Sequence, residues 1–227
     1  MMWRPKVTKS MTTINEKLAE YLDGLSPLVA GKLGEFQQSA YDEGLPIISR
    51  DVANFLSALM VIKRPCNILE IGCAVGFSAA LFTHFLPNGG KVTTIDRYEY
   101  MINRAKENFD TLGIADRVNI IEECASIALP RLAADGAKFD FIFMDAGKGQ
   151  YIRFLPYCLD MLASGGLLAA DDVLQNGDIA LEWSQITKRQ RTTYKNMRDF
   201  LAAAMALDGC FSSILPIGDG LLIVAKE

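Results

Sequence analysis

Short apolar runs alternate with longer segments of helical period along the chain, starting at about residue 65. The apolar runs cover residues 67–72, 91–96, 118–122, 139–145 and 166–171. The segments between them, 78–86, 98–112, 125–134 and 149–162, are each long enough for a helix. Continuous apolar strands that alternate with helices are typical of a parallel sheet covered on both faces. The pattern therefore predicts a doubly wound α/β fold.

The end of the chain has a different pattern. A helical stretch over residues 188–207 is followed by two β-like runs, 211–217 and 221–225, with only Gly218-Asp219-Gly220 between them. Three residues cannot hold the crossover that parallel strands need. We therefore expect these two runs to pair as a C-terminal antiparallel hairpin.

Residues 1–64 have a helical pattern and no strand signal. Thr13 is placed to cap a helix over residues 14–22, and residues 51–61 carry apolar side chains at helical spacing. We expect a helical N-terminal cap (1–64) that lies over the ligand-binding edge of the sheet or at an interface. It belongs to a single domain, 1–227, whose core is 65–227.

The composition excludes several kinds of site. The 227 residues are 50% hydrophobic with a formal net charge of -4, and the only histidine is His84, so multi-histidine metal sites are excluded. A Ser-His-Asp hydrolase would depend on His84 alone, which lies mid-helix and is predicted to be structural. The five cysteines form no C-x-x-C pair, which indicates reduced thiols. Because no apolar run is long enough for a bilayer span or a signal peptide, we expect a cytoplasmic protein without a membrane partner.

The first predicted strand ends in a glycine-containing turn. Its sequence is Glu70-Ile-Gly72-Cys-Ala-Val-Gly76-Phe-Ser78, and the second strand ends in Asp96, where an acid can bind ribose hydroxyls. The G-x-x-x-G spacing lacks the middle glycine of dinucleotide enzymes, which disfavours an NAD-dependent oxidoreductase. A simple turn between strand and helix is the alternative, but the two acids favour a nucleotide-like ligand.

Four segments of the chain resemble a known family. They are NILEIGCAVGFSAAL, VTTID, FDFIFMDAGKGQY and GGLLAADDVLQNG, and in this order they resemble the cation-dependent O-methyltransferases, which include catechol and caffeoyl-CoA O-methyltransferases. The resemblance covers residues 65–177, about half of the chain. It implies the Rossmann-like, seven-stranded sheet of class I methyltransferases with N-terminal helices, S-adenosylmethionine (SAM) as methyl donor, and a homodimer.

The resemblance also implies which residues bind SAM. Gly72 and Gly76 would let the backbone approach the ligand, and Glu70 and Ser78 would face its amino-acid end. The remaining SAM residues would be Asp96 at the ribose, Cys124 and Ala125 at the adenine, and Asp145. Two simpler alternatives stay open: Ser78 as a helix N-cap and Cys124 as a buried filler.

Three acids follow two strands that are neighbours in the methyltransferase strand order. Asp145 ends one strand, and Asp171 and Asp172 end the next, so their carboxylates meet at one edge of the sheet. Oxygen ligands without histidine or thiolate favour Mg2+, Mn2+ or Ca2+ over zinc. The family usually has Asn where this chain has Asp172, and the alternative role for all three is ordinary strand-end acids. Lys148 matches the family lysine near the substrate hydroxyl, where it can accept a proton, and a solvated loop lysine is its alternative.

The remaining signal is a run of cations. Residues 188–198 hold five cations in an acidic protein, and together with 215–222 they resemble the bacterial enzymes that methylate 5-hydroxyuridine at the tRNA wobble position. A solvated helix face is the alternative explanation of the charges. We therefore expect tRNA as the substrate. A catechol-like small molecule and a non-catalytic SAM-binding protein are the alternative hypotheses.

Overall fold

The computed structural model describes residues 21, 22 and 24–227, so most of the helix predicted over 14–22 lies outside the described part. The strands are β1 (Asn67–Ile71), β2 (Lys91–Asp96), β3 (Val118–Glu122), β4 (Phe139–Met144), β5 (Leu162–Ala170), β6 (Cys210–Leu215) and β7 (Leu221–Lys226). The longer helices are α2 (Lys32–Asp42), α3 (Arg50–Lys63), α4 (Phe77–Phe85), α5 (Glu99–Leu112), α6 (Ala125–Ala134), α7 (Tyr151–Met161) and α8 (Arg191–Met205). The predicted α/β class is confirmed.

All seven strands form one sheet, in the order β3-β2-β1-β4-β5-β7-β6. The pairs among β1 to β5 are parallel, whereas β7 is antiparallel both to β5 and to β6. The expected seven-stranded class I methyltransferase sheet and its C-terminal hairpin are therefore confirmed. The hairpin extends the sheet beyond β5 with its second strand on the inside: β7 lies next to β5, and β6 is the edge strand.

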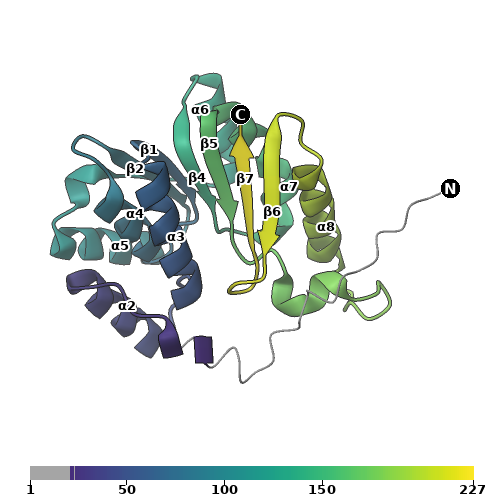
Figure 1. Cartoon of the computed structure of the whole chain (residues 1–227), viewed down its shortest axis with the longest axis horizontal. Helices are drawn as coiled ribbons and strands as arrows, with labels where there is room; N and C mark the ends of the chain where they lie inside the picture. Colours follow the sequence, from purple (N-terminus) through teal and green to yellow (C-terminus); the bar gives the residue numbers. More distant parts are fainter. Residues whose placement is uncertain (1–20, 23) are drawn as a thin grey trace.

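Helices cover the sheet on both faces and bury two separate cores (Figure 1). Helices α6, α7 and α8 bury residues such as Tyr151 and Phe200 on one face. Helices α2, α3, α4 and α5 bury residues such as Phe77 and Phe82 on the other face. Strand β7 serves both cores, since Leu222 and Val224 point to the first and Leu221 and Ile223 to the second.

The described N-terminal helices extend one helical layer, and α2 packs on the parts of α4 and α5 that follow the carboxyl edge of the sheet. Helix α3 begins one residue before and ends two residues after the predicted 51–61, and α2 was not separately predicted. The Phe36 ring of α2 packs edge-on against Phe77 of α4, with 5.7 Å between centroids. The start of α3 also reaches the carboxyl edge of the sheet, where Asp51 Oδ2 accepts the N–H of Gly218 at 2.8 Å.

Strand β5 starts four residues earlier than the apolar pattern predicts. Its pairing with β4 skips from Leu162 opposite Phe139 to Leu167 opposite Phe141, so the intervening residues form a bulge. Gly165 has φ +68°, and a Cβ on Gly166 would lie 2.7 Å from the carbonyl oxygen of Ala163. The bulge depends on these glycines, which interrupt the hydrophobic pattern.

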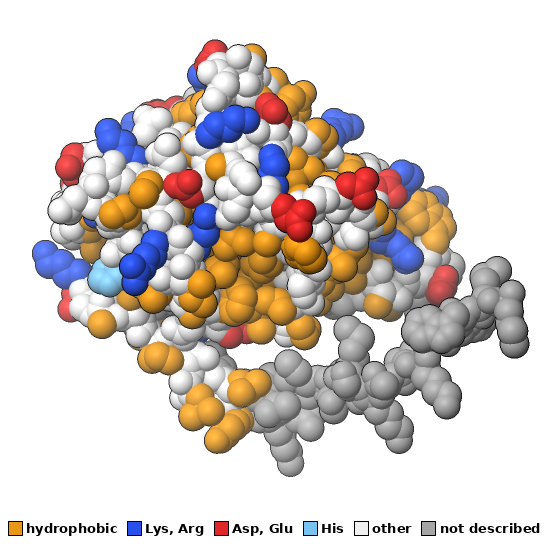
Figure 2. Space-filling view, turned by 45° about the horizontal axis from the view of Figure 1, so that its top comes forward, with side chains coloured by type: hydrophobic (Ala, Val, Ile, Leu, Met, Phe, Trp, Pro, Cys, Tyr) orange, Lys and Arg blue, Asp and Glu red, His pale blue; other side chains and the backbone are white. Residues whose placement is uncertain are grey.

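One part of the sheet is only partly covered. No helix lies in front of β5, β7 and β6 in Figure 1, and hydrophobic side chains gather on this side in Figure 2. Leu167, Leu215 and Ile223 are half-buried there, and Phe211 is 70% exposed. Within residues 21–22 and 24–227, no helix combines the length and hydropathy that a bilayer crossing needs.

Candidate active site

The predicted site residues meet at the carboxyl edge of the parallel strands, where open α/β sheets bind ligands. Three backbone hydrogen bonds fix the ends of β2, β1, β4 and β5 side by side. Gly72 N–H donates to Ile95 at 2.9 Å, Asp145 N–H to Ile71 at 2.9 Å and Asp171 N–H to Met144 at 3.0 Å. The prediction that the strands carrying Asp145 and Asp171 are neighbours is confirmed.

Glu70 is a fully buried acid near the end of β1. Its Oε2 accepts the hydroxyl of Thr94 at 2.5 Å, while its Oε1 is buried without a hydrogen-bond partner. Burial raises the pKa of Glu70 to about 8, although the Ser78 and Thr94 hydroxyls oppose the shift. A buried oxygen without a donor is costly, and the ammonium of an amino-acid ligand is a group that satisfies it.

Contacts within the protein explain the two glycines of the turn. Gly72 has φ +103°, and a Cβ there would lie 1.9 Å from the carbonyl oxygen of Asp145. Gly76 has φ +88°, and its Cβ would lie 2.6 Å from the ring of Phe109. Glycine is therefore required so that β1 approaches the end of β4 and α4 approaches α5. This reason differs from the ligand approach implied by the resemblance.

Asp96 organises the turn after β1. Its Oδ2 accepts the N–H groups of Cys73 and Ala74 at 3.0 and 2.9 Å. Its Oδ1 accepts the N–H groups of Arg97 and Tyr98 at 2.7 and 3.0 Å. Each oxygen thus holds two backbone donors, and Asp96 fixes the ends of β1 and β2 relative to one another.

The remaining predicted cofactor residues lie at helix starts. Ser78 is half-buried in the first turn of α4, whose N-cap is Gly76, so the N-cap interpretation of Ser78 is wrong. Cys124 is the N-cap residue of α6 and, like Ala125, is half-buried, so it is not a buried filler. The Ser126 hydroxyl, 3.1 Å from Cys124 Sγ, lowers the pKa of the thiol, and Arg97 adds to the effect.

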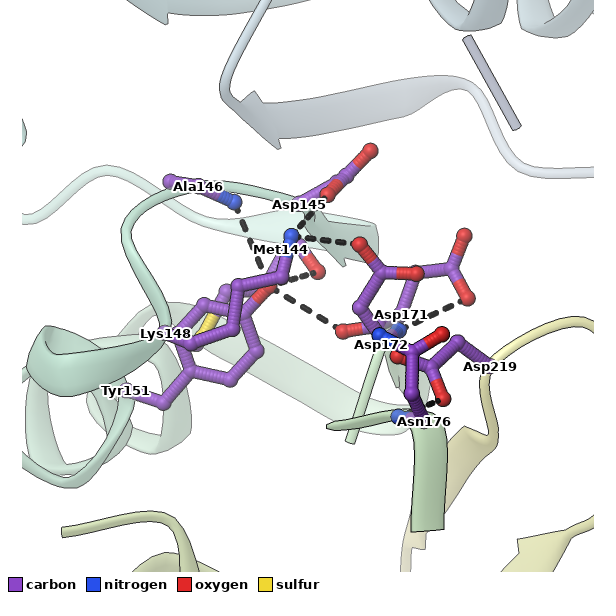
Figure 3. Close-up of polar contacts among 9 residues, drawn as sticks. All are labelled: Met144, Asp145, Ala146, Lys148, Tyr151, Asp171, Asp172, Asn176 and Asp219. Atoms are coloured by element: carbon purple, nitrogen blue, oxygen red, sulfur yellow. Dashed lines mark hydrogen bonds and ion pairs between the residues drawn. The ribbon is translucent and has the colours of Figure 1, made fainter. Parts of the chain in front are cut away.

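Lys148 lies between two of the predicted metal ligands (Figure 3). Its Nζ is 3.3 Å from Asp145 Oδ1 and 2.5 Å from Asp172 Oδ2. Asp171 is 4% exposed, and its Oδ1 accepts the N–H of Asp172 at 2.8 Å. The solvated-loop interpretation of Lys148 is therefore wrong.

The acids at this edge are crowded. Burial raises the pKa of Asp171 to about 7, and the charge of Asp145 adds to the effect. Burial also raises the pKa of Asp145, while Lys148 opposes the shift. Burial lowers the pKa of Lys148, but its two carboxylate partners outweigh burial and the net pKa lies above the ordinary value. Lys148 is thus held as an ammonium.

This arrangement is not a formed coordination shell. Among the described residues, no three His, Cys, Asp or Glu side chains are grouped so that they could hold a metal ion. The expected joint coordination by Asp145, Asp171 and Asp172 is not present, because the Lys148 ammonium lies where two of the carboxylates converge. The three acids still fit a hard divalent cation, since their carboxylate oxygens lie at one edge of the sheet. The raised pKa values of Asp145 and Asp171 show that their negative charges lack compensation, which a cation would supply.

Sequence reasoning missed Tyr151, which joins the ends of β4 and β5. Its fully buried hydroxyl accepts the N–H of Ala146 at 3.2 Å and lies 3.2 and 3.1 Å from the carbonyl oxygens of Met144 and Asp171. The sequence gives little indication of this role, because a tyrosine in the first turn of an apolar helix is common and the partners of Tyr151 come from two other segments of the chain. His84 is exposed on the last turn of α4, beside Phe85.

The cationic segment 188–198 flanks the loop of Lys148, because Asn196 Nδ2 donates to the carbonyl of Gly149 at 2.8 Å. Its cations have different surroundings. Lys188 and Arg189 are exposed, Arg191 lies over the Trp183 ring at 5.0 Å, Arg198 lies over Tyr194 at 5.4 Å, and Lys195 pairs with Asp199 at 2.6 Å. A groove of about 600 Å³ is lined by Glu182, Trp183, Tyr194, Lys195, Arg198 and Asp199. The segment is therefore an aromatic and cationic surface rather than a uniformly solvated face.

A family model described as O-methyltransferase matches residues 29–227. The chain belongs to the O-methyltransferase family. Caffeoyl-CoA O-methyltransferase 1 of Eucalyptus globulus is 30% identical over 188 residues, covering 78% of this chain and 74% of that protein. The caffeoyl-CoA O-methyltransferase of Petroselinum crispum is 30% identical over 189 residues, covering 78% and 76%.

Solved methyltransferase structures share the fold. A Podospora anserina methyltransferase bound to S-adenosylhomocysteine has a TM-score of 0.81 at 22% identity, covering 97% of this chain and 100% of that one. An O-methyltransferase of Bacillus cereus, also with S-adenosylhomocysteine, has a TM-score of 0.79 at 24% identity, covering 93% and 97%. The prediction of an O-methyltransferase is confirmed.

Proposed function

We propose that this O-methyltransferase moves the methyl group of SAM to a hydroxyl that has a second oxygen beside it. The observation that carries the proposal is the position of Lys148 Nζ among the acids that follow β4 and β5, at the same edge as Glu70. The methyl–sulfur bond breaks as the methyl–oxygen bond forms, S-adenosylhomocysteine leaves, and the hydroxyl proton remains for a base. The enzyme's part is then mainly orientation and charge stabilisation.

The SAM site of the proposal lies around Glu70. Its unpartnered Oε1 supplies an acceptor for the ligand ammonium, and the half-buried Ser78 follows Gly76 by two residues. Asp96 holds the turn and faces the ribose, while Cys124 and Ala125 border the adenine. The two solved methyltransferases bound to S-adenosylhomocysteine support SAM as donor.

Lys148 is the proposed proton acceptor. As an ammonium with two carboxylate partners, it cannot accept a proton, so this role requires that Asp145 and Asp172 release Nζ and that Nζ first loses one proton to water. Asp145, Asp171 and Asp172 would hold the divalent cation, which when bound stabilises the oxyanion of the acceptor. Mg2+, Mn2+ and Ca2+ all suit these donors.

The proposed acceptor is 5-hydroxyuridine at the tRNA wobble position. The exposed cations Lys188 and Arg189, next to Trp183 with its stacked Arg191, support it. Cations bind phosphates without sequence preference, and unpaired bases stack on aromatic rings and guanidinium planes. This acceptor places the enzyme in the cytoplasm. The caffeoyl-CoA O-methyltransferase relatives favour the second candidate, a catechol-type small molecule.

One assay separates these candidates. Methyl-labelled SAM and Mg2+ or Mn2+ are offered with unmodified tRNA, tRNA bearing 5-hydroxyuridine, and catechol. We expect label on the modified tRNA, and a Lys188→Glu/Arg189→Glu variant should lose that activity while a control Lys91→Glu variant keeps it. Lys91 is exposed at the start of β2, at the opposite edge of the sheet. Label on catechol alone would refute tRNA as the acceptor, and binding of SAM without transfer would favour the non-catalytic alternative.

We also propose a homodimer through the partly covered face of β5, β7 and β6. Exposed Phe211 and the half-buried side chains around it support this interface, since burying such apolar surface drives association. Sedimentation velocity should give a dimer, and Phe211→Glu should give a monomer. Met205→Glu is the matched control, because Met205 is 51% exposed at the end of α8 on the other face. A monomeric wild-type protein would refute the proposal.

A further inference from the structure

The loop after β5 has an unusual backbone. Asp172, Gln175 and Asn176 have φ values of +57°, +52° and +53°, and Gly177 follows with +85°. Asp and Asn adopt this region more readily than other non-glycine residues, but Gln175 is a type that rarely does, and three such residues so close together are unusual. Something outside the loop must therefore hold it.

The turn between β6 and β7 provides that support. The N–H of Val173 donates to the carbonyl of Gly220 at 3.0 Å, and that of Leu174 to the carbonyl of Asp219 at 2.8 Å. The N–H of Asn176 donates to the side-chain Oδ1 of Asp219 at 2.5 Å (Figure 3). Any residue could offer the two carbonyls, but the third bond needs the Asp219 side chain.

The turn is itself fixed from its other side. Gly218 N–H donates to Asp51 Oδ2 at the start of α3, and a Cβ on Gly218 would lie 2.7 Å from Val52. A Cβ on Gly220 would lie 2.2 Å from Leu174 of the loop. The turn is thus packed between α3 and the loop, with no room to shift.

We propose that Asp219 is a positioning residue for methyl transfer, because its carboxylate holds the left-handed turn at Asn176 and so keeps Asp172 at the end of β5, beside Asp171, where both acids would hold the cation. Asp171 is tied to β4 through its N–H on Met144. Asp172 therefore lies between two fixed points, the end of the sheet and the turn. Releasing the second point lets the loop relax to ordinary backbone angles and moves the Asp172 carboxylate.

The bond to the N–H of Asn176 needs an acceptor oxygen at the position of Asp219 Oδ1. An amide oxygen accepts the same N–H without the charge. Asp219→Asn should therefore keep the loop in place, whereas Asp219→Ala should release it.

The experiment compares wild type, Asp219→Ala, Asp219→Asn and a control Asp208→Ala, since Asp208 is exposed at the far end of β6. For Asp219→Ala we expect amide exchange at residues 173–176 to speed up at least about tenfold, and kcat to fall by about 10 to 100-fold, the loss expected for a small misplacement. The SAM Kd should stay within about twofold, because the SAM residues lie on other strands. Asp219→Asn and Asp208→Ala should resemble wild type in all three measurements.

Three results would overturn the proposal. The first is amide exchange or kcat in Asp219→Ala that equals wild type, and the second is an Asp219→Asn variant as impaired as Asp219→Ala. The third is a SAM Kd that rises by as large a factor as kcat falls. If Asp219→Ala does not fold, Asp219→Ser replaces it, and failure of both shows that Asp219 supports the whole fold instead. The kinetic part rests on the proposed function. If wild type methylates neither acceptor, that function fails while the amide exchange still tests Asp219.

Discussion

Replacing Glu70 by glutamine should change how stability depends on pH. Each pKa unit corresponds to about 1.4 kcal/mol, so a rise from 4.5 to about 8 makes the ionised form roughly 5 kcal/mol less favourable in the folded protein. Because the folded protein holds this proton more tightly than the unfolded chain, the stabilisation is complete below about pH 4.5. It is lost as the pH rises towards about 8.

Glutamine keeps the shape and cannot ionise. The free energy of unfolding of Glu70→Gln minus that of wild type should therefore increase by roughly 3.5 kcal/mol between pH 5 and pH 8. Urea unfolding of the ligand-free proteins across this range measures it. Asp171, whose pKa is raised to about 7, shifts both proteins in the same direction and largely cancels in the difference.

The same residue should link SAM binding to proton release. If the ligand ammonium pairs with the free Oε1, Glu70 ionises on binding, so wild type releases up to one proton near pH 6 and Glu70→Gln releases none from this site. Titration calorimetry in buffers of different ionisation enthalpy counts the protons. The urea experiment can refute the reasoning about burial. It does so if the difference between the two free energies of unfolding changes by less than about 1 kcal/mol from pH 5 to pH 8.

Three further substitutions test the site. Lys148→Ala should lower kcat by about 100 to 10,000-fold, the usual contribution of a general base, with unchanged SAM binding; full activity at saturating Mg2+ would remove Lys148 from the mechanism. Asp172→Asn removes one of the charges that raise the pKa of Lys148, so the rise of kcat with pH should move to lower pH, and an unmoved pH profile would contradict this. Tyr151→Phe leaves the N–H of Ala146 without its acceptor and should reduce the free energy of unfolding by about 1–3 kcal/mol, measured in urea; a smaller loss would mean that water replaces the hydroxyl.

The hydrophobic pattern was sufficient for the sheet because its period is a local property. The five parallel strands and the hairpin followed from runs such as 67–72 and 221–225. The start of β5 was misplaced because the bulge at Gly165 and Gly166 interrupts the apolar run. The insertion of β7 beside β5 depends on packing between distant segments, which no local pattern encodes.

The candidate site was predicted only as far as its residue types. Strand-end acids such as Asp145 and Asp171 could be located from the sequence, since strand ends share an edge. The position of Lys148 between the carboxylates could not be predicted from the sequence, because it depends on the side-chain contacts of two loops. Tyr151 and Asp219 were missed as site residues for the same reason: each contacts backbone groups 20 or more residues away.

The turn between β6 and β7 has a length that two unrelated requirements constrain. The two cores hold Leu222 and Val224 on one face of β7 and Leu221 and Ile223 on the other, so the strand cannot slip by one residue to absorb an insertion. Added residues would have to bulge out of the turn and would carry Asp219 away from Asn176. During sequence divergence, most surface loops tolerate added residues, whereas this one should resist both odd and even insertions.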